Sequence, residues 1–282
     1  MRLMLVLLFL FAANYVYAGI FFNDPTGREF NAAYDRFSED HLKDLNGDDK
    51  HLKQYLLGVL YVDGDQEFDV RKDCRKAVSL LQKAWQANVV DAGFTLATMY
   101  YDGVCLDKDL DKARGLATDT AEDGYILSQR MLGRAYLGRS WKGLYPKNME
   151  KAVFWLSKAA NAGDTQSAGA LSAIYRKGIG VAVDEKKSFY WAKKSAFSKY
   201  ESDKIINFHY LAGYYEKGVG TSVDLVSAYK YYDLSGTAGV ESKRRIAKEM
   251  TQEQIDEAIR QSKEWQKEHN VQVGGGFIRR AN

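Results

Sequence analysis

The feature that most constrains the fold is a short pattern that occurs five times along the chain. Each copy reads leucine, a small residue, any two residues and then tyrosine. Successive tyrosines are 39, 36, 39 and 40 residues apart, a period typical of repeat proteins built from paired helices. The five leucine–tyrosine pairs are Leu57 and Tyr61, Leu96 and Tyr100, Leu132 and Tyr136, Leu171 and Tyr175, and Leu211 and Tyr215.

Each copy of the pattern has a second half. A small residue follows the tyrosine by 13 or 16 positions, and a large residue stands three positions further on. Spacings of three and four residues place side chains on one face of a helix, so each unit predicts two helices, A and B. The chain is therefore expected to be all-α, an α/α superhelical solenoid of about five helix pairs whose neighbours share a core. The small and large residues are Ala77 and Leu80, Ala113 and Leu116, Ala152 and Trp155, Ser188 and Trp191, and Ala228 and Tyr231.

Turn residues separate the two helices of each unit. A glycine follows the tyrosine by three positions in four units, where it is suited to the left-handed conformation that ends a helix. An aspartate then stands near the predicted start of helix B, where a carboxylate caps free backbone N–H groups. These aspartates are expected to be Asp107, Asp184 and Asp224.

The segments outside the repeats predict caps and a tail. Residues 47–239 hold the repeats, and an apolar stripe at helical spacing predicts an N-terminal capping helix segment within 19–46. Residues 240–270 predict a C-terminal capping helix, which a capping box opens at Thr251. Three consecutive glycines follow, so residues 271–282 are expected to form a flexible tail.

The first eighteen residues have the pattern of a signal peptide. Arg2 precedes an apolar run, and small residues at Val16 and Ala18 favour cleavage after Ala18. The protein is therefore expected in the periplasm or outside the cell, with no membrane insertion after cleavage. An uncleaved N-terminal anchor is the alternative.

The two cysteines fall in neighbouring repeats. Cys74 lies near the start of the first helix B, and Cys105 lies in the A–B turn of the second unit. Stacking brings these edges together, so a disulfide is expected, with two separate thiols as the alternative.

Composition and motifs give no sign of catalysis or nucleic-acid binding. The chain holds 40 Lys and Arg against 37 Asp and Glu, which leaves no clustered basic surface for nucleic acid. The four histidines form no close ligand pair, and the sequence lacks a phosphate loop, a dinucleotide fingerprint and a nucleophile elbow. No catalytic residue, cofactor or metal site is therefore expected.

The full pattern resembles the Sel1-like repeat, a relative of the tetratricopeptide repeat. The likeness is clearest from Leu171 to Asp184 and from Lys151 to Ala160, and it extends over about 47–239. It implies a non-catalytic, monomeric adaptor or regulator that binds a protein in the periplasm. An immunity protein that neutralises a secreted toxin, such as a lipase-type effector, is the alternative. A cell-wall-related hydrolase and an envelope structural component are weaker readings, the first because no nucleophile–base pair is present.

The resemblance also suggests where a partner binds. In the tetratricopeptide arrangement, helix A lines the concave face. Its inward positions stand two before, two after and five after the leucine of the repeat pattern, which is called the column leucine below. The three arginines among the corresponding residues predict contact with an acidic segment of the partner. Tyr55 and Phe94 have a second interpretation, as packing residues between helices, and Trp141 in the enlarged turn is an alternative binding site. The predicted face comprises Tyr55, Phe94, Tyr101, Arg130, Arg134, Arg176, His209 and Glu216.

Overall fold

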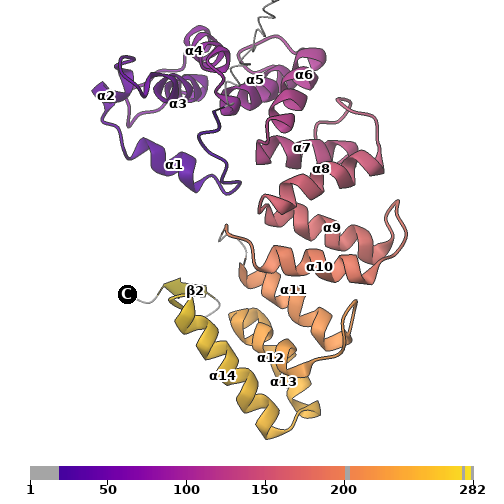
Figure 1. Cartoon of the computed structure of the whole chain (residues 1–282). Coiled ribbons are helices and arrows are strands. Elements are labelled where there is room, and N and C mark those ends of the chain that lie inside the picture. The colour runs from indigo at the N-terminus through magenta and orange to yellow at the C-terminus, as the bar shows by residue number, and fades with distance from the viewer. Residues whose placement is uncertain (1–18, 201–203, 275–276, 281–282) are drawn as a thin grey trace, which may run out of the picture.

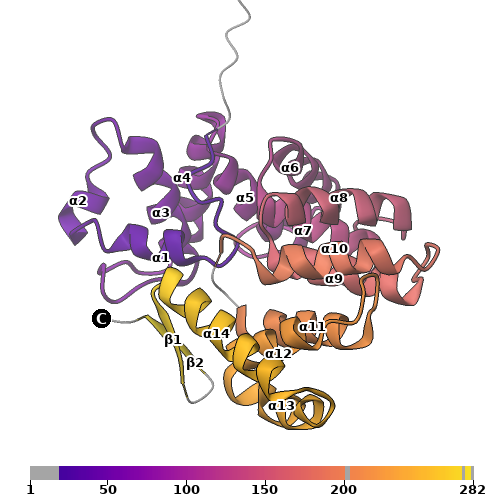
Figure 2. The same ribbon diagram turned by 60° about the horizontal axis from the view of Figure 1, so that its bottom comes forward.

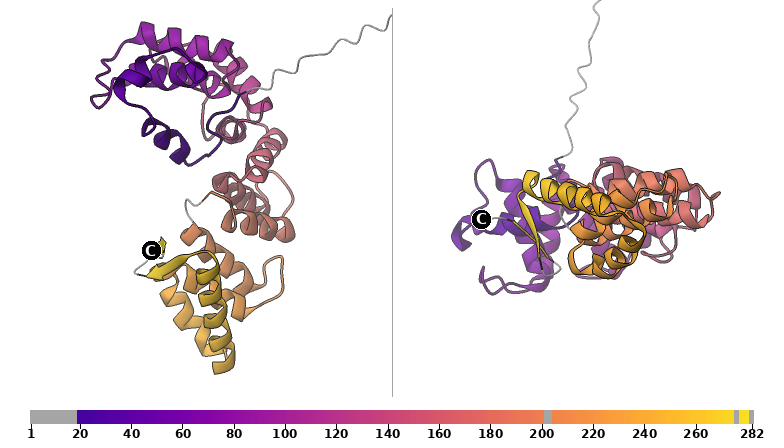
Figure 3. Two further views of the ribbon diagram at one scale, coloured as in Figure 1. Left: turned by 60° about the vertical axis from the view of Figure 1, so that its left-hand side comes forward. Right: turned by 90° about the horizontal axis from the view of Figure 1, so that it is seen from below.

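The computed structural model describes residues 19–200, 204–274 and 277–280, and its helices form the five predicted pairs (Figure 1). The pairs follow a C-shaped path, with α1 and α14 on the inner side of the curve, one at each end. The left view of Figure 3 shows the same curved stack. The A helices are α3 (Lys50–Asp63), α5 (Val90–Asp102), α7 (Ile126–Tyr136), α9 (Thr165–Lys177) and α11 (Lys204–Lys217). The B helices are α4 (Cys74–Gln86), α6 (Leu110–Glu122), α8 (Met149–Asn161), α10 (Glu185–Ala196) and α12 (Leu225–Leu234).

Small side chains set how closely helices A and B approach each other. The five small residues predicted on the B helices are completely buried. On the A helices, a methyl group added to Gly133 would lie 2.6 Å from Cγ of Leu156 on α8. No side chain larger than hydrogen fits there without movement, so the glycine in the repeat pattern is a packing requirement.

The A–B turns share one set of hydrogen bonds. In all five units, the backbone N–H of the residue before helix B donates to the carbonyl oxygen of the tyrosine of the repeat pattern, over 2.9–3.0 Å. The side chain of the same residue caps helix B. The expected cap Asp107 is wrong, because Asp109 stands nine residues after its tyrosine, as Asp184 and Asp224 do. The capping residues are Asp73, Asp109, Asn148, Asp184 and Asp224.

Short helices close both ends of the stack. At the N-terminal end α1 (Arg28–Tyr34) and α2 (Glu39–Lys43) bury Ala33 and Leu42 in the core of the first repeat. The C-terminal end is more segmented than a single helix. It consists of η1 (Gly236–Gly239), α13 (Val240–Ile246), η2 (Ala247–Glu249) and α14 (Gln252–Glu268). The predicted capping box opens α14, and Trp265 of this helix packs edge-on against Phe208 with ring centroids 5.2 Å apart.

The described residues after α14 form two short strands in the segment for which the sequence predicts a flexible tail. Strands β1 (Val271–Gly274) and β2 (Phe277–Arg280) pair antiparallel, with Val271 opposite Arg280, and the hairpin lies beside α14 (Figure 2). Val271 and Val273 pack against the cluster around Trp265, and the backbone N–H of Val273 donates to Oε1 of Gln266 over 2.8 Å. These apolar contacts hold β1 against α14 and its neighbours.

A disulfide between Cys74 and Cys105 joins the first two repeats, as predicted, with their Cα atoms 4.8 Å apart. The predicted signal peptide, residues 1–18, lies outside the described residues. Within the described part of the chain, no helix has the length and apolar character to cross a bilayer.

Candidate partner-binding surface

An extended N-terminal segment, residues 19–24, crosses the inner side of the curve and is called the strap below (Figure 1). Gly19 forms a parallel bridge with Val89, just before α5. The backbone N–H groups of Phe21 and Phe22 donate to the carboxylate of Asp91 over 2.9 and 3.0 Å. Asp91 is completely buried. Burial raises the pKa of its carboxyl, and the N–H groups of the strap oppose that shift.

Asn23 carries the strap on to later repeats. Its side-chain oxygen accepts a hydrogen bond from the backbone N–H of Ile126 at the start of α7, over 3.0 Å. Its carbonyl accepts one from the hydroxyl of Tyr200 over 2.9 Å, and the Tyr200 ring lies against the turn at Gly163. The strap therefore ties the turns before α5, α7 and α9 together on one side of the solenoid.

The N-terminal half of the predicted partner face is filled by this same chain. Tyr55 is buried beneath the rings of Phe22 and Phe30, with centroids 6.0 and 5.9 Å away. Its assignment to partner binding is corrected, because the capping segment already supplies the contact.

The enlarged turn after α7 folds inward. Trp141 is only 6% exposed, and its ring lies 6.0 Å from Phe94 and 5.9 Å from Tyr101 between centroids. The Tyr101 hydroxyl donates to the carbonyl oxygen of Lys142 over 3.2 Å. Trp141 is therefore a core residue, and Phe94 and Tyr101 are its partly buried neighbours. The alternative binding site at this turn is corrected for that reason.

The three predicted arginines are not equivalent. Arg130 Nη1 lies 3.0 Å from Oδ1 of Asp164, with the two side chains 17% and 1% exposed. Asp164 also caps α9 through the backbone N–H and hydroxyl of Ser167. The Arg130 charge is thus neutralised within the fold, whereas Arg134 and Arg176 are exposed. A single surface of all three arginines does not form.

Glu216 and His209 also have internal roles. The carboxylate of Glu216 accepts hydrogen bonds from both terminal guanidinium nitrogens of Arg245 on α13 and from the Tyr232 hydroxyl, the latter over 2.6 Å. The guanidinium is the main cause of the lowered pKa of Glu216. The His209 ring packs 5.0 Å from that of Tyr232, and burial lowers the pKa of His209. Glu216 thus joins α11 to α13 of the C-terminal cap, and His209 packs α11 against α12.

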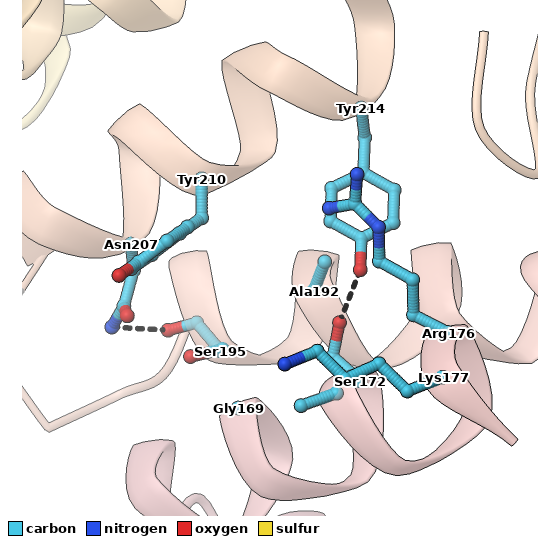
Figure 4. Close-up of a pocket in the computed structure, with 10 residues that line it drawn as sticks. Gly169, Ser172, Arg176, Lys177, Ala192, Ser195, Asn207, Tyr210 and Tyr214 are labelled. Atoms are coloured by element: carbon cyan, nitrogen blue, oxygen red, sulfur yellow. Dashed lines mark hydrogen bonds between the residues drawn. The ribbon is translucent and has the colours of Figure 1, made fainter. Parts of the chain in front are cut away.

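One predicted residue, Arg176, does line a cavity. This cavity has a volume of about 450 Å³, lies between α9 and α11, and has α10 at its base (Figure 4). It is called the α9–α11 pocket below. The α9 wall carries Gly169, Ser172, Ala173, Arg176 and Lys177, the base carries Ala192 and Ser195, and the α11 wall carries Asn207, Tyr210 and Tyr214.

The cationic end of the α9–α11 pocket rests on a fixed platform. The guanidinium carbon of Arg176 lies 5.2 Å from the centre of the Tyr214 ring, a cation–π arrangement. The buried Tyr214 hydroxyl shares hydrogen bonds with the hydroxyls of Ser172 and Ser188 over 2.7 and 2.6 Å. These contacts hold the ring beneath Arg176, and Lys177 adds a second positive charge.

The other end of the α9–α11 pocket is aromatic and amide-bearing. The Tyr210 side chain is 65% exposed, and Asn207 Nδ2 donates to the carbonyl oxygen of Ser195 over 3.2 Å (Figure 4). Among the described residues that line the pocket, two are cations and none is a carboxylate. The pocket is therefore positively charged at one end and carries a tyrosine ring and an amide at the other.

The positions predicted from the repeat include residues of only one wall of this pocket. On α9 the lining residues Gly169, Ala173 and Arg176 occupy the predicted positions, two before, two after and five after the column leucine. On α11 the lining residues stand four before, one before and three after that leucine. Tyrosines four residues apart, Tyr210 and Tyr214, were the available sequence signal for the missed wall.

Among the residues that the structure describes, no group of three or more His, Cys, Asp or Glu side chains is placed to hold a metal ion.

Comparison with known proteins identifies the repeat. The Sel1 repeat family matches at 54–88, 93–125, 126–164, 166–196 and 209–240, which together make up more than half of the chain. A curated relative, Activator of C kinase protein 1 of Saccharomyces cerevisiae, is 37% identical over 100 residues, which is 33% of this chain and 16% of the relative. The chain thus spans about a sixth of the length of that relative.

A solved structure shares the fold. It is a protective antigen present in uropathogenic Escherichia coli strains and displaying an SLR fold, with a TM-score of 0.60 and 24% identity over 77% of this chain and 46% of the antigen. A weaker match is a Sel1 repeat protein from Oxalobacter formigenes, with a TM-score of 0.49 and 24% identity over 74% of this chain and 56% of that protein. Sel1 repeats generally mediate protein–protein interaction. On the strength of the five matched repeats and the observed helix pairs, this chain belongs to the Sel1 repeat family.

Proposed function

We propose that this protein is a non-catalytic, monomeric adaptor of the periplasm that binds an acidic segment of a protein partner at the α9–α11 pocket. The observation that carries the proposal is the charge of the pocket, since the described residues that line it include two cations and no carboxylate. A negatively charged segment is the complement of such a surface.

Two further observations favour this site and this compartment. The strap and the caps cover other parts of the A helices, whereas Tyr210 of the pocket remains 65% exposed, and exposed tyrosine and arginine anchor many protein interfaces. The disulfide between Cys74 and Cys105 suits an oxidising compartment, as the signal-like first eighteen residues do. The name of the yeast relative describes a protein that acts on another protein, a C kinase.

Photo-crosslinking in living cells tests the partner site. A photoreactive residue in place of Tyr210 is expected to give one discrete protein adduct. The matched control is Tyr190 on α10, which is 46% exposed but outside the pocket, and it is expected to give none. Equal labelling from both positions, or no adduct from Tyr210, would contradict the proposed site. A secreted toxin as the adduct would instead identify an immunity protein.

Cell fractionation tests the compartment separately. The protein is expected in the periplasmic fraction, shortened to begin at Gly19, with Cys74 and Cys105 unreactive toward a thiol reagent after denaturation without reductant. Recovery in the cytoplasm with two reactive thiols would refute the periplasmic assignment and leave the crosslinking result unaffected.

A further inference from the structure

Resting on the proposed function, we infer that the α9–α11 pocket recognises an extended peptide in which an acidic residue and an aromatic residue stand two positions apart. The acidic residue meets Arg176, and the aromatic residue packs on Tyr210. The inference follows from the spacing of the two ends of the pocket and from how Arg176 is held.

The guanidinium of Arg176 is held in an orientation that suits a carboxylate ligand. Its guanidinium lies over the Tyr214 ring, so one face of the planar group is covered and its N–H edges are directed sideways. Carboxylates bind such edges with two parallel hydrogen bonds. The Tyr214 ring is in turn anchored through its hydroxyl by Ser172 and Ser188. Tyr214 is therefore a positioning residue, which acts on the ligand through Arg176.

Tyr210 supplies the second contact. It stands four residues before Tyr214 on α11, so the two side chains are one helical turn, about 6 Å, apart along the helix axis. Its ring is exposed, and it makes no ring contact with another aromatic residue among the described residues. An exposed tyrosine ring of this kind offers a face for an aromatic side chain.

The distance between the two ends selects the ligand spacing. An extended chain advances about 3.3 Å per residue and places alternate side chains on the same side. Residues two positions apart are therefore about 6.6 Å apart and face the same way, which matches the rise of about 6 Å along α11 between Tyr210 and Tyr214, the residue on which Arg176 lies. Adjacent residues would face opposite sides, and residues four apart would overshoot the pocket.

Defined synthetic peptides test the inference against the full-length mature protein by fluorescence anisotropy. The probe is Gly-Ser-Glu-Ser-Trp-Ser-Gly, labelled at its amino end. Replacing its Glu with Gln is expected to weaken binding about ten-fold or more, and replacing its Trp with Ala about three- to ten-fold. Peptides with Glu and Trp adjacent, or four apart, are expected to bind as weakly as these single replacements.

Protein variants assign the two contacts. Arg176→Gln is expected to abolish the preference for Glu over Gln, and Tyr210→Ala the preference for Trp over Ala. Tyr214→Phe keeps the ring but loses its anchoring hydroxyl, and it is expected to reduce the Glu preference while leaving the Trp preference unchanged. Arg139→Gln removes an exposed charge outside the pocket and serves as the control. Circular dichroism establishes that each variant is folded.

Three results would overturn the inference. The first is equal affinity for all spacings, and the second is loss of both preferences together in Tyr214→Phe. The third is binding of wild type, but not of Arg176→Gln, to phosphatidylglycerol vesicles without peptide binding, which would indicate a membrane surface instead. If the peptides fail while the Tyr210 crosslink persists, only this inference is wrong. Absence of the crosslink contradicts the proposed function itself.

Discussion

The pair formed by Arg130 and Asp164 gives the sharpest test of the structure, because the repeat pattern assigned Arg130 to the partner. Replacing Arg130 with alanine leaves a carboxylate that is 1% exposed with only its Ser167 hydrogen bonds. Removing one partner of a buried ion pair costs about 3–5 kcal/mol, and a single hydrogen bond to a charged group contributes about 1.5–3 kcal/mol. Because Arg130 is 17% exposed, water can enter its place, so we expect a loss of about 2–3 kcal/mol.

Thermal unfolding followed by circular dichroism measures this loss. For a chain of this size, about 2–4 °C of Tm corresponds to each kcal/mol, so Arg130→Ala is expected to melt about 4–12 °C below wild type. Arg134→Ala, one turn away on the same helix and exposed, is the control and is expected to change stability by less than about 0.5 kcal/mol. Equal melting of the two variants, or loss of partner capture by Arg130→Ala at unchanged Tm, would refute the structural role of Arg130.

Three further predictions concern the repeats and the C-terminal cap. Replacing Cys74 and Cys105 with serine opens a loop closed over a sequence separation of 31, and chemical denaturation should show a loss of about 3–4 kcal/mol; unchanged stability would refute the constraint. Gly133→Ala should destabilise the protein by about 1–2 kcal/mol, because the added methyl group would lie 2.6 Å from a leucine of α8 and strain outweighs the gain in helix propensity. Gly115→Ala on α6, with nothing within 4 Å of the new methyl group, should instead stabilise it, and the same direction of change in both variants would contradict the packing argument. The lowered pKa of Glu216 means that its ionised form stabilises the fold at neutral pH and that this contribution is lost as pH falls through the folded-state pKa. The Tm of wild type should therefore exceed that of Glu216→Gln at pH 7, and the difference should shrink in acid; a difference that grows in acid would refute the sign.

The repeat made most of the architecture predictable. Helices A and B were predictable from side chains that recur three and four positions apart. The small residues of the pattern were interpretable because the two helices must approach each other closely. The pairing of Cys74 with Cys105 was predictable for the same reason, because stacked repeats place equivalent edges together. These are local or nearest-neighbour properties, and a solenoid is built almost entirely from such contacts.

The accessibility of the A-helix side chains depended on the tertiary structure. The repeat predicted Tyr55 at an inward position, and only the folded chain shows the strap and α1 covering it. Arg130 and Asp164 are 34 residues apart. No periodic pattern pairs them, because only one repeat has an arginine at the first position and only one has an aspartate at the second. The turn around Trp141 has the composition of an exposed segment, yet aromatic rings from α5 bury the Trp141 side chain.

The α9–α11 pocket shows the same division between sequence and structure. The position of Arg176 in the pocket was predictable, because helical spacing alone decides which residues of α9 share a face. The opposite wall was not, because the angle at which α11 packs beside α9 decides which of its residues face the gap. That angle is set by contacts among several helices, including the tyrosine and serine hydroxyls buried between repeats. The sequence by itself determined the repeating helix pairs and their shared core, and only the tertiary structure decided which side chains remain free for a partner, since burial depends on segments far apart in the chain.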